Sequence, residues 1–169
     1  MKLLLIRHAI AEPRQADGGT QPDDALRALT PRGSRRMHAA ASGLARASDP
    51  PDLLATSPLV RATETAAIVA ETFDSLTPVS VPELRPGAGP DAVLAWLRTL
   101  PAGHVVAAVG HEPDLSLTAS YLLASRREPL LTFKKGGAGL LTVPPGILPG
   151  TATLEWLLTP RQLRSFGRQ

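Results

Sequence analysis

Two short apolar runs constrain the fold more than any other feature of this sequence. Lys2–Ile6 and Val105–Val109 are almost wholly apolar and are bounded by polar residues or glycine. Continuous rather than alternating runs of this length are typical of strands in a parallel sheet that is covered on both faces. Weaker patterns of the same kind predict further strands at Asp52–Ala55 and Ala138–Val143. The chain is therefore expected to build a buried central sheet.

The last predicted strand spans Thr151–Leu158. Its apolar residues Leu154, Trp156 and Leu158 recur at every second position, and side chains at that spacing lie on one face of a strand. We therefore expect these three side chains to face the core together.

Proline-started helical patterns separate the strands. Proline suits the first position of a helix because its missing N–H would have no partner there, and Thr or Ser just before it can cap the helix. Helices are expected at 31–47 after a Thr30 cap, from Ser57-Pro58 to about residue 73, at 89–100 and at 113–123. Residues 13–29 and 74–89 are rich in Pro, Gly and Asp and are expected to be loops.

The alternation of strand, helix and strand predicts the fold class. It indicates α/β, with a mostly parallel central sheet and right-handed crossovers that place helices on both faces. At 169 residues the chain is long enough for one domain and short for two, so we expect a single domain over residues 1–169.

Composition excludes several classes of function. Apolar residues make up 43% and charged residues 20%, which is an ordinary globular balance. There is no cysteine, so disulfides, thiol nucleophiles and cysteine metal clusters are excluded. The N-terminal apolar run is too short for a signal peptide, and no stretch approaches the ~20 apolar residues of a membrane span. We expect a cytoplasmic protein with no membrane partner.

The charge balance gives little support to nucleic-acid binding. The formal net charge is +3, the basic residues are scattered, and six aromatic residues are few for stacking bases. A mildly basic surface is the plainer interpretation, and positive charge around an anionic substrate is the alternative. A monomer is expected, with a phosphorylated protein or small molecule as its partner.

Polar residues follow three of the predicted strands at the point where each ends. Arg7-His8 follow the first strand, Ser57-Pro58 the second, and Gly110-His111 the strand at 105–109. In an open parallel sheet, ligands bind outside the carboxyl ends of the strands. The sequence therefore predicts that these side chains converge on one crevice.

The residue types at that crevice are suited to phosphate. Arg61 lies one turn into the helix opened by Ser57-Pro58, so it can point back toward His8 and His111. Two imidazoles and the guanidiniums of Arg7 and Arg61 would form a pocket for a dianionic tetrahedral group, because arginine presents its donors as a fork that matches phosphate oxygens. A helix that starts just after His111 would favour an anion nearby.

Four segments together resemble the motifs of the histidine phosphatase superfamily. Residues 1–9 (MKLLLIRHA) resemble its Arg-His-Gly signature, and residues 29–33 (LTPRG) its Leu-Thr-x-x-Gly element. Residues 57–65 (SPLVRATET) resemble its Ser-x-x-x-Arg-x-x-x-Thr element. Residues 110–114 (GHEPD) resemble the late Gly-His motif of the branch that contains the SixA phosphohistidine phosphatases. The motifs keep the family's order and spacing from residue 1 to about 160.

The resemblance implies an activity and assigns roles to four residues. His8 would be the nucleophile that takes the phosphoryl group and passes it to water, with Arg7, Arg61 and His111 completing the phosphate pocket. It implies a phosphoglycerate mutase-like fold, no cofactor and no metal. Ala9 replaces the glycine of the signature.

A second departure from the family concerns the proton donor for the leaving group. Many relatives carry an acid just after the third strand, whereas this chain has Pro86 there, and Glu83 lies at the wrong spacing. An alkoxide leaving group needs a proton, but the imidazole of phosphohistidine has a pKa near 6.5 and can leave protonated. The absent acid therefore favours phosphohistidine on a protein as the substrate. Two alternatives stay open: a phosphatase of the same superfamily acting on small phosphate esters, and a module that binds a phosphorylated partner without turnover.

Several other residues carry competing interpretations. Arg61 could instead pair with Glu64 on the helix surface. Glu112 and Asp114 could be ligands, or only partners of a helix dipole. Lys134 and Lys135 could line the rim of the pocket or end a solvated strand. Metal-dependent hydrolysis is the weaker hypothesis, because no His-Glu-x-x-His motif or carboxylate cluster is present and two arginines would repel a cation.

Overall fold

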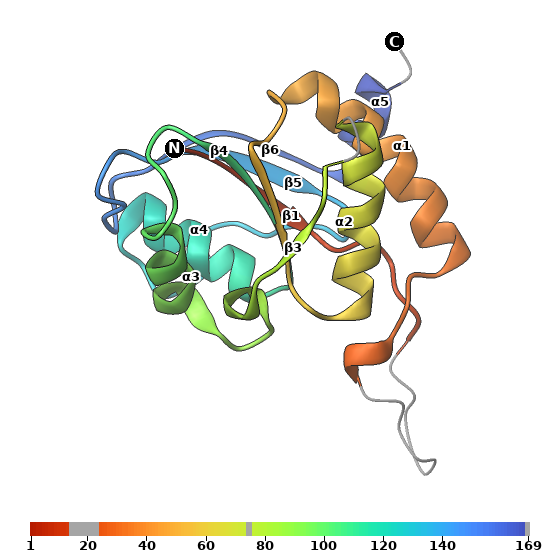
Figure 1. The fold of residues 1–169 in the computed structure, drawn as a ribbon, viewed down its shortest axis with the longest axis horizontal. Helices are drawn as coiled ribbons and strands as arrows, with labels where there is room; N and C mark the ends of the chain where they lie inside the picture. Colours follow the sequence, from red (N-terminus) through yellow and green to blue (C-terminus); the bar gives the residue numbers. More distant parts are fainter. Residues whose placement is uncertain (14–23, 74–75, 168–169) are drawn as a thin grey trace.

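A six-stranded sheet forms the centre of the fold (Figure 1). The computed structural model describes residues 1–13, 24–73 and 76–167. The strands are β1 (Lys2–Arg7), β2 (Leu53–Thr56), β3 (Val79–Ser80), β4 (Val105–Gly110), β5 (Ala138–Thr142) and β6 (Thr153–Leu158). The helices are α1 (Pro31–Ala47), α2 (Val60–Thr72), α3 (Gly89–Leu97), α4 (Asp114–Ala124) and α5 (Pro160–Phe166), with 3₁₀ helices η1 (Asp24–Leu26) and η2 (Pro82–Leu84).

The sheet is mostly parallel, as the sequence predicts. Its strand order is β3-β2-β4-β1-β5-β6. The first four of these strands run parallel to one another, and β5 is antiparallel to both β1 and β6. β1, β2 and β4 are therefore adjacent, and their carboxyl ends lie at one edge of the sheet.

Helices cover both faces of this sheet, which confirms the predicted class. Leu4 and Ile6 of β1 pack into a core with α1, α2 and α5, whereas Leu3 and Leu5 pack on the other face with α3 and α4. All four side chains are fully buried, and each contributes about 1.5–3 kcal/mol of transfer free energy. The continuous apolar run was the correct signal for a strand buried on both faces.

Two helix boundaries differ from the prediction. α2 begins at Val60 rather than at Ser57, because the Ser57 N–H donates to the Val109 carbonyl and so extends the sheet edge. α3 ends at Leu97 rather than at residue 100, because the chain tightens there into a turn in which Thr99 N–H donates to the Trp96 carbonyl.

Some short elements lie where the sequence predicts loops. β3 and η2 fall within 74–89, and η1 falls within 13–29. Residues 14–23 and 74–75 of these two ranges lie outside the described part of the chain. α5 is a further helix that the sequence analysis missed. Its signal was present, because Thr159 and Gln162 form a capping box with Pro160 at the first helical position between them.

The prediction for the last strand was wrong about Leu154. A bulge interrupts the β5–β6 ladder between Leu140 and Leu141, so that Leu140 pairs with Trp156 and Leu141 with Leu154. The side chains of two paired residues lie on the same face of the sheet. Leu140 and Leu141 are consecutive in β5 and point to opposite faces, so their partners Trp156 and Leu154 also point to opposite faces. Trp156 packs against the core, and Leu154 is exposed.

No helix in the described ranges is long and apolar enough to span a membrane.

Candidate active site

The carboxyl ends of β1, β2 and β4 bring the predicted site residues together. The His8 N–H donates to the Gly110 carbonyl and the Ser57 N–H to the Val109 carbonyl, so all three strand ends are tied side by side. The rings of His8 and His111 lie with their centroids 5.0 Å apart. The crevice expected from the strand ends is therefore present.

A cavity of about 310 Å³ opens at this edge of the sheet. The four predicted phosphate-site residues, Arg7, His8, Arg61 and His111, all line it. Arg27 also lines it, and the sequence analysis did not single out that residue.

His8 is held as a neutral imidazole with a defined tautomer. Its Nδ1 lies 2.7 Å from the Ala9 carbonyl oxygen. A carbonyl can only accept, so Nδ1 carries the proton and Nε2 has the lone pair. The side chain is 7% exposed and lines the cavity, so this lone pair belongs to a buried group beside the place where a substrate would bind.

Burial keeps both histidines uncharged near neutrality. Desolvation lowers the pKa of His8 to about 4, and the nearby guanidiniums of Arg61 and Arg7 act in the same direction. Desolvation likewise lowers the pKa of His111 to about 3, with His8 and Arg61 adding to the effect. A nucleophile must be unprotonated, and His8 meets that requirement at pH 7.

The stability of the protein should therefore fall in mild acid. A histidine with a lowered folded pKa stabilises the fold above its unfolded pKa of about 6.5, and this stability is lost as the pH falls toward the folded pKa. Between pH 7 and pH 4.5, urea unfolding should show a loss of about 2 kcal/mol from each of the two histidines. The variant His8→Asn should lose less than the wild type. An equal loss in both proteins would show that His8 does not titrate in this way.

His111 lies beside His8 at the cavity and is anchored by Ser57. Its Nε2 is 2.8 Å from the Ser57 Oγ, and Ser57 in turn accepts a hydrogen bond from the Leu59 N–H at 3.4 Å. The Nδ1 of His111 is buried without a partner among the described residues. An unpaired buried nitrogen beside a cavity is suited to a polar ligand.

Arg7 is oriented by a chain of hydrogen bonds that runs through Phe133. A terminal nitrogen of Arg7 donates to the Phe133 carbonyl at 2.7 Å, and the Phe133 N–H donates to the Glu112 carboxylate at 2.6 Å. Ser116 donates to the same carboxylate from its hydroxyl at 2.6 Å and from its N–H at 3.4 Å. Glu112 thus helps to position Arg7, and its carboxylate oxygens already accept hydrogen bonds. Desolvation lowers the pKa of Arg7, and the charge of Glu112 opposes that change.

Arg61 does not pair with Glu64, so that alternative was wrong. One terminal nitrogen of Arg61 donates to the Asp24 carbonyl at 2.7 Å and the other to the Asp24 carboxylate at 3.0 Å. The carboxylate of Glu64 instead accepts from the Leu29 N–H. Asp24 also accepts from Arg27 Nε at 2.8 Å, so one carboxylate holds both arginines at the cavity.

The other residues singled out in the sequence differ in whether they line the cavity. Pro86 lines the cavity, whereas Glu83 is half-buried and is not among the lining residues. Asp114 accepts hydrogen bonds from two glycine N–H groups, at positions 87 and 89, and so fixes the loop before α3. Lys135 lines the cavity and Lys134 does not. No group of three or more metal-ligating side chains occurs among the residues described.

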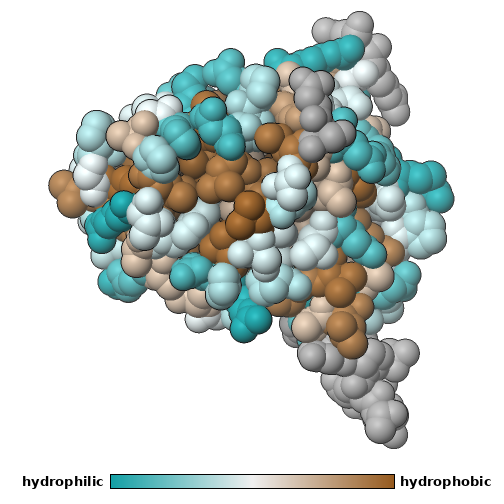
Figure 2. Space-filling view, in the orientation of Figure 1, coloured by the Kyte–Doolittle hydropathy of each residue, from teal (hydrophilic) through white to brown (hydrophobic). Residues whose placement is uncertain are grey.

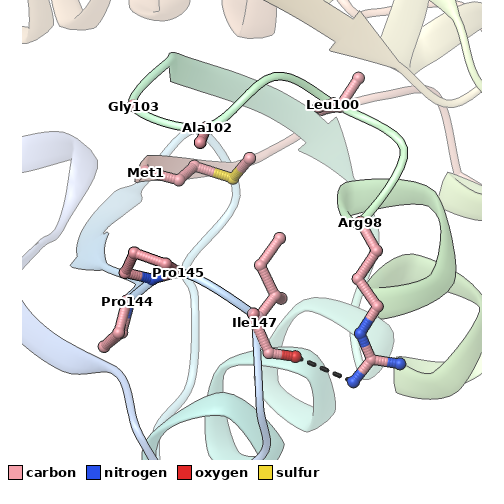
Figure 3. A pocket seen from close by; sticks show the side chains of 9 residues that line it. Met1, Arg98, Leu100, Ala102, Gly103, Pro144, Pro145 and Ile147 are labelled. Carbon is pink, nitrogen blue, oxygen red and sulfur yellow. Dashed lines mark hydrogen bonds between the residues drawn. The ribbon is translucent and has the colours of Figure 1, made fainter.

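A second cavity, of about 220 Å³, lies at the amino ends of the strands, around Met1 and Ile147 (Figure 3). Arg98 is the one charged side chain among its lining residues, and it donates to the Ile147 carbonyl at 2.9 Å. This cavity holds no nucleophile or acid, so the chemistry is concentrated at the carboxyl edge.

Comparison with known proteins shows which family the chain resembles. Residues 3–86 match the model of the histidine phosphatase superfamily, branch 1. An uncharacterised protein of Picosynechococcus sp. is 33% identical over 139 residues, which cover 81% of this chain and 82% of that protein.

Solved structures share the whole fold. The protein histidine phosphatase SixA complexed with tungstate is similar with a TM-score of 0.80 and 23% identity, over 96% of this chain and 99% of that chain. A protein of Escherichia coli assigned as an alpha-ribazole-5′-P phosphatase is similar with a TM-score of 0.72 and 21% identity, over 95% of this chain and 97% of that chain. At these identities the likeness establishes a common fold and leaves the substrate open.

Proposed function

The chain belongs to the histidine phosphatase superfamily, and we propose that it hydrolyses phosphohistidine on a protein through a phospho-His8 intermediate. The observation that carries the proposal is the state of His8. Its Nδ1–H is bound to the Ala9 carbonyl, and its Nε2 lone pair lies in a cavity with three arginines and a second histidine. That arrangement is suited to in-line attack on phosphorus.

The proposed reaction has two steps. Nε2 of His8 attacks phosphorus, the P–N bond of the substrate breaks, and the leaving imidazole carries its own proton. Water then attacks phospho-His8 and releases phosphate. Arg7, Arg61 and His111 stabilise the charge on the equatorial oxygens in both steps. Asp24 holds Arg61, and Phe133 holds Arg7, so that the donors are arranged before the substrate arrives.

The surroundings of the leaving group favour phosphohistidine over an ester. Pro86 lines the cavity where relatives carry an acid and has no proton to give. Glu112 lines it too, but this carboxylate would have to release three hydrogen bonds to reach a substrate. A site without an available strong acid suits a leaving group that needs none. The SixA structure, which shares the fold, is that of a protein histidine phosphatase.

A small phosphate ester is the second candidate substrate. Glu12 lines the cavity, is exposed, and could donate a proton to an alkoxide. The Escherichia coli protein with this fold that is assigned as an alpha-ribazole-5′-P phosphatase belongs to that class. Phosphate release from a histidine-phosphorylated protein and from sugar phosphates, compared by kcat/KM, tests the choice. We expect the phosphoprotein to be preferred, and a preference for sugar phosphates would overturn the proposal.

The phosphatase activity should be independent of metals. Three arginines and a lysine line the cavity and would repel a cation, so activity is expected to survive EDTA unchanged. Vanadate should inhibit, because it adopts the geometry of a phosphoryl group in transfer. Steady-state rates with and without each reagent measure both effects. Loss of activity on chelation, with recovery on adding a divalent ion, would show that a metal takes part.

A further inference from the structure

Two packed helices beside the active site carry six arginines and no carboxylate. They are Arg32, Arg35, Arg36 and Arg46 on α1 and Arg161 and Arg164 on α5. The helices lie so close together that Gly43 of α1 faces the Leu163 carbonyl with no room for a side chain. In Figure 2 hydrophilic side chains, in teal, gather on the upper right edge, where Figure 1 draws these helices.

This basic surface is continuous with the active site. A small cleft is lined by Arg36, Lys135 and Arg164, and Lys135 also lines the cavity that contains His8. The loop that carries Lys135 is fixed against the nucleophile, because the Gly136 N–H donates to the carbonyls of Arg7 and His8. We define the basic face as the set Arg32, Arg35, Arg36, Lys135, Arg161 and Arg164.

The basic face is not explained by the stability of the fold. Arg32 lies in the first turn of α1, which has no acidic residue, and a cation there is repelled by the positive end of the helix dipole. Arg35 and Arg36 follow in the next turn, and both are exposed. Within the described ranges, none of these three side chains forms an ion pair. Arginines at the helix start are repelled by the positive end of the helix dipole, so their presence there points to a role in binding.

We propose that the basic face binds an acidic segment of the protein that carries the phosphohistidine. The inference rests on the proposed function, and it adds the chemistry of the partner. An acidic segment lying along α1 would be drawn in by the positive field and would place its phosphohistidine at the cavity next to Lys135. α1 and α5 contain a single aromatic residue, Phe166, which is too few to stack successive bases, so a protein fits better than single-stranded nucleic acid.

The test uses two phosphohistidine peptides that differ in the residues around the histidine, four Glu in one and four Gln in the other. The wild type should show a kcat/KM about tenfold higher for the Glu peptide, and this advantage should shrink as salt is added. The double variant with Arg32→Glu and Arg36→Glu should lose the advantage and keep its kcat/KM on the Gln peptide. Its melting temperature should be equal or higher, because glutamate suits the start of a helix.

A control reverses the charge of one exposed arginine outside the basic face. Arg126 is exposed after α4, and Arg126→Glu should leave the preference for the Glu peptide intact. Equal kcat/KM for the two peptides in the wild type would overturn the proposal, as would an unchanged preference in the double variant.

Binding separates this inference from the proposed function. The unphosphorylated Glu peptide should bind His8→Ala about tenfold more tightly than it binds the same protein with both arginine substitutions added. If the wild type turns over neither phosphopeptide, the proposed function fails. This binding comparison still tests whether the basic face binds an acidic segment. Tighter binding of a DNA duplex than of the Glu peptide at the same salt concentration would assign the surface to nucleic acid and contradict the inference.

Discussion

Replacing His8 with alanine is expected to lower kcat by at least about 10³-fold, because losing a covalent nucleophile removes the two-step route. The fold should survive. Within the described residues, the His8 ring makes one hydrogen bond, to the carbonyl of the next residue, and the side chain lies at a strand end beside an open cavity. Turnover of a phosphohistidine substrate together with circular dichroism measures both effects.

His38→Ala is the matched control for this substitution. His38 is an exposed histidine on α1 whose ring lies 3.6 Å from the carboxylate of Glu71, and it does not line the cavity. Its loss should leave turnover within about twofold of the wild type, as is usual for an exposed side chain. A His8→Ala protein that is folded and retains more than about a tenth of the wild-type rate would exclude His8 as the nucleophile.

The second large effect concerns the leaving group. We expect kcat/KM to fall from phosphohistidine to aryl phosphate to alkyl phosphate. Pro86 lines the cavity where an acid would act, so an alkoxide must leave with little help. General acid catalysis contributes about 10²–10⁴-fold, and the handicap of alkyl esters should fall in that span. Phenolates leave more easily than alkoxides, which places aryl esters between the two.

Steady-state rates on the three substrate types measure this order, and Glu12→Gln tests the remaining donor. If Glu12 protonates alkoxides, its amide variant should slow alkyl phosphates and leave phosphohistidine unaffected. Alkyl phosphates that match phosphohistidine in the wild type would contradict the argument from the absent acid and favour the small-ester phosphatase.

The centre of the site could be predicted from the sequence because it follows from strand ends. Arg7-His8, Ser57 and His111 each come directly after an apolar run, and the carboxyl ends of adjacent parallel strands must meet at one edge. No knowledge of side-chain contacts was needed for that step. The tautomer of His8 could not be predicted, because it depends on the path of the chain at Ala9.

The outer part of the site depends on contacts that no local pattern encodes. Asp24 holds Arg61 from 37 residues away, and it binds Arg27 as well. The spacing of Arg61 and Glu64 favoured a local pair, but the Leu29 N–H takes the Glu64 carboxylate instead. Long-range competition of this kind overrides a helical spacing whose pairs contribute only about 0.2–0.5 kcal/mol.

In the fold, too, the regular strands could be predicted from the sequence and the irregular features could not. Continuous apolar runs correctly gave β1 and β4, because burial on both faces leaves a strong pattern. The two-residue β3 is too short to have a pattern at all, and the bulge that turns Leu154 away from Trp156 leaves the alternation in the sequence intact. Both features are set by pairing with a neighbouring strand.

Trapping the covalent intermediate tests the central claim most directly. The wild type is mixed with a histidine-phosphorylated protein, quenched in alkali within the first turnover and analysed by mass spectrometry of its peptides. The account predicts phosphate on His8, stable in alkali and lost in acid, and its absence from His8→Ala. First-turnover release of phosphate with no phosphorylated His8 at any quench time would contradict the account and indicate direct attack by water.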